Sequence, residues 1–275
     1  HAKGMLRAGT IAVRRAGARG LVGASPLRAL GVCVRGWSSS ADRAGLGDFN
    51  ELRERSLLAH VIKTAPEGNA EAVMQAMDDF WDTSFGGAGS EEWKLRGAAL
   101  DMAIKAKRPA QAMEVGTYCG YTAVRVGRLL PPGGKLISVE IDSLFAAIAS
   151  KVVEHAGLQD VVSVQIGTVT EALAKIERKK LLSGPLGAVL LDHDTSRYTA
   201  DLEILERQGL VQPDTIVLCD WSLYPGSEET MQAPITHEAF MAHLKERSGA
   251  GVRTISHKMQ DKEVLTVSSW GDWTV

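Results

Sequence analysis

A glycine-rich turn and an acidic side chain beyond it are the first residues whose types and spacing could support chemistry. The segment from Glu114 to Thr122 holds Gly116 and Gly120 in a turn that is expected to open a helix. Glycines there let a ligand approach the backbone, and a helix N-terminus attracts anions. The GxxxG spacing differs from the GxGxxG of dinucleotide-binding loops, which disfavours a pyrophosphate ligand. The acid that precedes the turn suits a ligand with an ammonium group. Glu140 stands 24 residues after Gly116 (140 minus 116), where a carboxylate can accept both ribose hydroxyls of an adenosine-bearing cofactor.

One more glycine and two more acids stand at the ends of short apolar runs later in the chain. Gly167, Asp192 and Asp220 each end or follow a run that is typical of a buried strand. The carboxyl ends of parallel strands meet at one edge of a sheet, and ligands bind there in this class of fold. The sequence therefore predicts one site built from these three residues together with Gly116 and Glu140.

The elements that must position these residues alternate between short strands and amphipathic helices. We expect strands at 111–115, 135–140, 161–166, 186–191 and 215–219, and two β-rich runs at 252–256 and 263–269. After a first helix that begins near Asp48, we expect helices at 70–82, 91–107, 121–130, 143–156, 169–178, 200–208 and 235–247. This alternation predicts an α/β fold with a parallel sheet covered on both faces.

Composition excludes several classes of protein. The 275 residues are 45% apolar and 23% charged, which is ordinary for a globular protein. No run approaches the ~18 consecutive apolar residues of a membrane span. Cys33, Cys119 and Cys219 lie too far apart for a disulfide framework or a CxxC zinc site, and we expect the last two to be apolar fillers. The net charge of −2 makes a nucleic-acid partner unlikely for the chain as a whole.

The N-terminal segment differs from the rest in charge. Residues 1–41 carry seven basic side chains and no acid, so the remainder carries −9 (−2 minus 7). An Arg-rich, Ser-bearing, acid-poor segment is typical of an organelle transit peptide, and a basic arm that binds nucleic acid or anionic lipid is the alternative. We expect 1–46 to be such a segment, which would direct the chain to a mitochondrion or plastid, and 47–275 to be a single domain. Without a transit peptide the expectation is a cytoplasmic protein.

The run from Glu114 to Asp142, EVGTYCGYTAVRVGRLLPPGGKLISVEID, resembles the cofactor-binding core of the catechol O-methyltransferase family. These enzymes use S-adenosylmethionine. The likeness continues in APEGNAEAVMQAMDDFW, in LLDHDTSRY and in CDWSLYPG, and it covers about 48–230. It implies the class I methyltransferase fold, a Rossmann-like, mostly parallel sheet of seven strands in which a C-terminal hairpin supplies a reversed strand.

The resemblance also implies a role for each residue that matches the family's motifs. The residues implied to bind S-adenosylmethionine are Gly116, Thr117, Tyr118, Thr122, Glu140, Ile141, Gly167, Thr168, Thr170 and Asp192. Asp192 and Asp220 are implied to hold Mg²⁺, whose oxygen ligands include those of a chelating catechol. A base then takes the proton of the attacking hydroxyl.

Three positions depart from the family's pattern on the acceptor side. His193, Asp194 and Thr195 stand where the family has His-Trp-Lys, and that Lys is its base. Trp221 stands where the family has an Asn metal ligand, and the later substrate-orienting Glu has no counterpart around 249–257. In one interpretation Asp194 replaces the Asn and His193 serves as the base. In the others, the acceptor is not a catechol and no metal is used, or the chain binds the cofactor without catalysis.

We therefore expect a monomeric, Mg²⁺-assisted O-methyltransferase for a catechol-like or other small hydroxylated acceptor. A nicotinamide-dependent oxidoreductase on a similar sheet is the alternative enzyme, and the spacing of the glycines disfavours it.

Overall fold

The structure is a computed structural model, and it describes residues 47–85, 90–221, 235–248, 252–259 and 262–269. The predicted transit peptide at 1–46, the loop at 86–89 and the Pro-Gly turn at 225–226 lie outside these ranges, and so do Cys33 and part of 249–257. Among the described residues, no helix is both long enough and apolar enough to cross a membrane.

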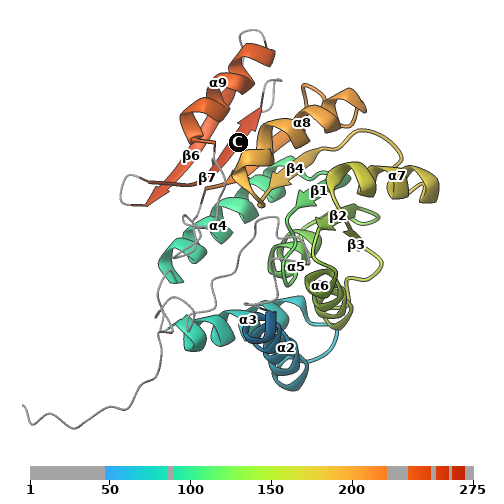
Figure 1. Ribbon diagram of the computed structural model, residues 1–275, viewed down its shortest axis with the longest axis vertical. Helices are drawn as coiled ribbons and strands as arrows, with labels where there is room; N and C mark the ends of the chain where they lie inside the picture. The colour runs from blue at the N-terminus through green and yellow to red at the C-terminus, as the bar shows by residue number, and fades with distance from the viewer. Residues whose placement is uncertain (1–46, 86–89, 222–234, 249–251, 260–261, 270–275) are drawn as a thin grey trace, which may run out of the picture.

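A seven-stranded sheet forms the middle layer of the molecule (Figure 1). Its strands are β1 (Gln111–Val115), β2 (Lys135–Glu140), β3 (Val162–Ile166), β4 (Ala188–Leu191), β5 (Ile216–Asp220), β6 (Arg253–Met259) and β7 (Lys262–Ser269). They lie in the order β3-β2-β1-β4-β5-β7-β6. The first five are parallel, and β7 runs antiparallel to both β5 and β6. The predicted sheet, with its reversed strand from a C-terminal hairpin, is confirmed.

Eight α-helices flank the sheet within the described ranges. They are α2 (Gly47–Thr64), α3 (Ala70–Phe85), α4 (Ser90–Lys107), α5 (Tyr121–Gly127), α6 (Ser143–His155), α7 (Val169–Lys179), α8 (Tyr198–Arg207) and α9 (His237–Ser248). Six boundaries differ from the prediction by more than one residue, and for two of them the reason is visible. The helix expected to reach residue 130 ends at Gly127, ahead of Pro131. The helix expected from residue 200 begins at Tyr198, after a 3₁₀ turn, η2 (Thr195–Arg197), that Asp194 caps.

The strands are apolar on both faces because helices cover both. In one cluster of buried side chains, the five helices α2, α3, α4, α5 and α6 pack on one face of the sheet. The strand residues of this cluster include Ala112, Leu136, Ala188, Leu190, Ile216 and Leu218. The other joins α7, α8 and α9 to the opposite face, through Met113, Ile137, Val189, Leu191, Val217 and Cys219. Burial raises the pKa of the Cys219 thiol well above its ordinary value, so this side chain is the unreactive filler that the sequence predicts.

The alternation of side chains along β4 and β5 decides which way their terminal acids point. Leu191 pairs with Cys219, so Asp192 and Asp220, the next residue of each strand, stand side by side. Asp192 and Asp220 follow Leu190 and Leu218 by two residues, so their side chains point to the same face of the sheet as those leucines. The two acids therefore face α4 and not α8.

Candidate functional site

The turn after β1 brings two strand ends into direct backbone contact. Gly116 has φ of 97°, and a Cβ placed there would lie 2.0 Å from the carbonyl oxygen of Asp192. Its N–H donates to Val139 O at 2.9 Å, and Asp192 N donates to Val115 O at 2.8 Å. Only glycine fits this position, because a side chain would collide with the backbone of Asp192.

Glu140 is fixed at the end of β2, beside that turn. Its two carboxylate oxygens accept from Tyr118 N at 2.7 Å and from Asp142 N at 2.9 Å. Asp142 in turn caps α6 by accepting from Leu144 N at 2.8 Å. The carboxylate is buried and ionised oxygens can accept further hydrogen bonds. The turn and the acid that the sequence predicts as ligands of one cofactor are thus brought together.

Tyr118 supplies its backbone to the site and its ring to the core. Its φ is 50°, and the buried ring packs against Trp81 and Phe145 at centroid distances of 6.0 and 4.9 Å. The phenol donates to the buried Glu54 of α2. Helix α2 therefore holds the turn in place, and Trp81 is a core residue.

A second chain of hydrogen bonds supports the turn from within the sheet. Thr117 Oγ1 lies 2.5 Å from Ser138 Oγ, which donates to Glu114. Glu114 and Ser138 are paired residues of β1 and β2, and neither is exposed to solvent. Glu114, the acid that the sequence predicts to suit a ligand's ammonium group, is thus hydrogen-bonded to Ser138 and through it to Thr117 of the turn.

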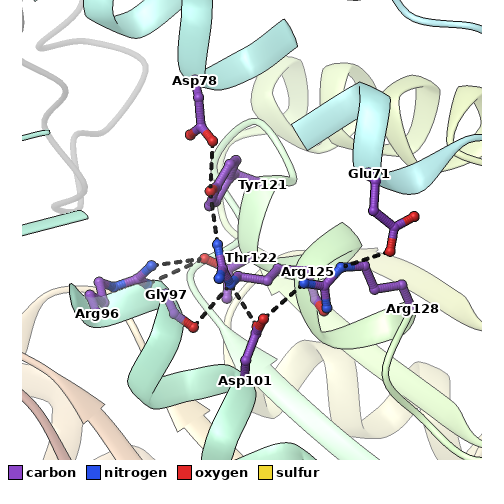
Figure 2. A network of polar contacts seen from close by, with 9 residues as sticks. All are labelled: Glu71, Asp78, Arg96, Gly97, Asp101, Tyr121, Thr122, Arg125 and Arg128. Atoms are coloured by element: carbon purple, nitrogen blue, oxygen red, sulfur yellow. Dashed lines mark hydrogen bonds and ion pairs between the residues drawn. The ribbon is translucent and has the colours of Figure 1, made fainter. Parts of the chain in front are cut away.

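The acids at the ends of β4 and β5 enclose an arginine. Arg96 Nη2 lies 2.5 Å from Asp192 Oδ2, and Arg96 Nε lies 2.5 Å from Asp220 Oδ2. Both guanidinium Nη atoms also lie 3.3 Å from Thr122 Oγ1 (Figure 2). The face of the guanidinium lies 5.0 Å from the ring of Trp93.

The helix that carries Arg96 is locked to its neighbours by a network of charges (Figure 2). Asp101 of α4 accepts from Arg125 of α5 at 2.7 Å and from Arg128, the residue that follows α5, at 2.9 Å. Tyr121 donates to Asp78 of α3 at 3.3 Å and accepts from Arg125 at 3.0 Å. Burial, followed by the negative charge of Asp78, raises the pKa of Tyr121 to about 12.

The residues present do not fit the predicted Mg²⁺ site. Mg²⁺ needs near-octahedral oxygen ligands, whereas Asp192 and Asp220 are each bonded to Arg96. Asp194, the predicted replacement ligand, accepts from Ser196 N at 2.9 Å and caps η2. Within the described ranges there is no group of three His, Cys, Asp or Glu side chains that could hold a metal.

His193 is directed to α8. Its Nε2 lies 2.9 Å from Asp201 Oδ2, and its ring packs against Tyr198 at 5.1 Å. The buried Nδ1 makes no hydrogen bond to any residue that the structure describes. A carboxylate only accepts, so in the neutral ring that donates to Asp201 from Nε2, Nδ1 is the acceptor nitrogen.

Trp221 belongs to an aromatic cluster on the same side of the sheet as α8. Its indole N–H donates to Thr266 Oγ1 at 2.8 Å, and its ring contacts Tyr198, His237 and Phe240 at 5.3 to 5.8 Å. The side chain is half-buried. The indole has no oxygen that could bind a metal ion beside Asp220.

The remaining predicted cofactor residues lie beyond β2 and β3. Ile141 is 45% exposed, so its apolar side chain is open to a ligand. Gly167 has φ of 126°, and its N–H donates to Glu140 O at 2.8 Å. Thr168 caps α7 in a reciprocal pair with Glu171, and Thr170 is exposed.

Sequence reasoning missed two residues of the site, Arg96 and Asp201. Arg96 is the first member of an apolar helical stripe that continues through Ala99, Leu100, Ala103 and Ile104. A charged residue on such a stripe signals a buried charge that needs partners. Asp201 lies eight residues after His193, and nothing in that spacing singles it out.

The chain is similar to known O-methyltransferases. A sequence model of the O-methyltransferase family matches residues 92–253, more than half of the chain. Catechol O-methyltransferases from Mus musculus and Bos taurus are 36% and 34% identical to it over 182 and 185 residues. Those alignments cover 64% and 66% of this chain, and 66% and 65% of the mouse and bovine proteins, just under two thirds of each.

A solved structure supports the fold. The O-methyltransferase from Bacillus cereus, crystallised with SAH, superposes with a TM-score of 0.51 at 19% identity over 63% of this chain and 80% of its own. The likeness is to the class I methyltransferase fold, and it agrees with the strand order described above. With the family match over 92–253, it follows that this chain belongs to the O-methyltransferase family.

Proposed function

We propose that this chain transfers a methyl group from S-adenosylmethionine to a hydroxyl oxygen of a small phenolic acceptor, with catechols as the first class to test. The observation that carries the proposal is Glu140, held by two backbone N–H groups beside the turn that begins at Gly116. The names of the mouse and bovine relatives support the choice of acceptor.

The residues fit the cofactor in the following way. Glu140 would accept the ribose hydroxyls, and Ile141 would cover one face of the adenine, with Gly167, Thr168 and Thr170 at its edge. Gly116 would admit the methionine part to the backbone, beside Thr117 and Tyr118. Thr122 and Asp192 would close the site on the α4 side, where both contact Arg96.

When bound, S-adenosylmethionine supplies an electrophilic methyl group on a sulfonium. His193 is the residue that we propose as the base, because Asp201 orients its ring through Nε2. Its other ring nitrogen, Nδ1, is buried, so it would have to become accessible when the acceptor binds. Nδ1 would take the proton of the acceptor hydroxyl, and the acceptor oxygen would then be the nucleophile for the methyl group that the cofactor supplies. Asp201 holds the His193 ring in a fixed orientation.

Methyl transfer from labelled S-adenosylmethionine to a panel of catechols and monophenols tests this function. We expect the full chain to methylate at least one catechol. His193→Asn should lower kcat about 10²–10⁴-fold, as expected for loss of a general base, and Asp201→Asn should lower it less. Cofactor binding without turnover on any acceptor would favour the non-catalytic alternative that the changes at Thr195 and Trp221 left open.

A further inference from the structure

The acids at the sheet edge already hold a cation. Arg96 is 0% exposed, and its guanidinium joins Asp192 and Asp220 at 2.5 Å each. We infer that this guanidinium is the permanent counter-cation of the two carboxylates and takes the place predicted for Mg²⁺, so that methyl transfer by this chain needs no divalent metal. The part about methyl transfer rests on the proposed function, whereas the part about metal binding stands without it.

The guanidinium is held from several sides. Two strands supply the carboxylates, α5 supplies Thr122 Oγ1 at 3.3 Å, and Trp93 covers the guanidinium face at 5.0 Å. If Arg96 moved aside for a metal, its own charge would be buried without its two strongest acceptors. A planar guanidinium with donors on two edges also matches two carboxylates better than a flexible ammonium would. The arrangement is therefore a fixed ion triad rather than an open ligand set.

The charges and ligands around the triad oppose a second cation. The two carboxylates and the guanidinium sum to −1 (−2 plus 1), and Mg²⁺ placed on the same carboxylates would stand a few ångströms from the guanidinium, where like charges repel. Asp194, which could complete its coordination, caps η2 instead, and Trp221 has no oxygen that could serve as a ligand.

The residual charge suits the proposed reaction. A net charge of −1 attracts the sulfonium cation, while the two carboxylates alone would carry −2 and would oppose the negative charge that develops on the acceptor oxygen. Arg96 limits that opposition by neutralising one of the two negative charges. It is a positioning residue, because it acts on the reacting atoms through Asp192 and Asp220.

Metal binding can be measured directly with Mn²⁺ as a spin probe for a divalent cation. The full chain is titrated with Mn²⁺, and the signal of free Mn²⁺ is followed by electron paramagnetic resonance. We expect no Mn²⁺ site in the wild-type chain and a new site in Arg96→Ala, because the two carboxylates are then released. Arg96→Lys keeps the positive charge, so it should not gain the site.

A matched control separates this effect from the loss of any buried ion pair. Arg125→Ala removes the ion pair to Asp101 but leaves the Arg96 triad intact. We expect Arg125→Ala to lose thermal stability without gaining Mn²⁺ binding. If Arg96→Ala does not fold, the wild-type and Arg96→Lys titrations still decide the matter.

The same preparations are assayed for methyl transfer with Mg²⁺ and with a chelator. The wild-type rate should agree within about twofold between the two conditions, and Arg96→Ala in the chelator should lose about 100-fold in kcat/KM. A wild-type chain that binds Mn²⁺, or whose turnover stops in the chelator, would overturn the inference. Absence of turnover in both conditions would contradict the proposed function, while the Mn²⁺ titration would still judge the role of Arg96.

Discussion

The contact between the first turn and β4 offers a substitution whose cost can be worked out from the structure. Gly116→Ala places a Cβ 2.0 Å from Asp192 O at a backbone φ of 97°. The conformation alone costs about 1–3 kcal/mol for a residue with a side chain. To relieve the clash, the strand ends must separate, which weakens the bonds Gly116 N–Val139 O and Asp192 N–Val115 O at about 1 kcal/mol each. The expected loss of unfolding free energy is therefore about 3–5 kcal/mol.

Urea unfolding measures this loss, and Gly133→Ala is its control. Gly133 also has a positive φ, 79°, but a Cβ there would meet nothing within 4 Å. It should cost only the strain, about 1–2 kcal/mol. The difference between the two variants isolates the contact with β4. Equal losses in the two variants would refute the argument that this contact shapes the site.

Three further predictions concern the supports of the site. Tyr121 should ionise near pH 12, measured by the absorbance of tyrosinate. Because this pKa lies above the ordinary value of 10.0, the stability linked to the neutral phenol is complete below pH 10 and is lost as the pH rises toward 12. Tyr121→Phe should abolish that loss. Asp142→Ala should cost about 1 kcal/mol of unfolding free energy through the lost cap of α6, while S-adenosylhomocysteine affinity changes little because the backbone N–H to Glu140 remains; a large loss of affinity would argue against a backbone role. Gly97→Ala would put a Cβ 2.5 Å from Arg125 Cζ and should displace Arg125 from Asp101, for a loss of about 1–3 kcal/mol in urea unfolding; an unchanged midpoint would show that Arg125 finds another place.

The fold could be predicted from the sequence because local signals agree with one another. The short apolar runs of β1 and β2 end at a glycine turn and an acid, and the helix after β2 begins at an ordinary Asp142 cap. The strand ends of the site were predictable for the same reason, since parallel strands bring their carboxyl ends to one edge.

The partners of those strand-end residues could not be predicted. Arg96 lies 96 residues before Asp192 and 124 before Asp220 in the chain, so only the packing of α4 on the sheet brings them together. The sequence alone left Asp192 and Asp220 as an apparent metal site. The direction of His193 toward Asp201 depends on the start of α8, which the prediction placed two residues late.

The central claim is that the strand-end site binds the methyl-donor cofactor through Glu140. Calorimetric titration of S-adenosylhomocysteine into the full chain tests it most directly, with Glu140→Ala beside Glu67→Ala, an exposed carboxylate between α2 and α3. We predict one site per wild-type chain, unchanged affinity in Glu67→Ala, and about 100-fold weaker binding in Glu140→Ala, the equivalent of losing one or two hydrogen bonds to a charged group. A wild-type chain that does not bind S-adenosylhomocysteine, or a Glu140→Ala variant that binds it as the wild type does, would contradict the account.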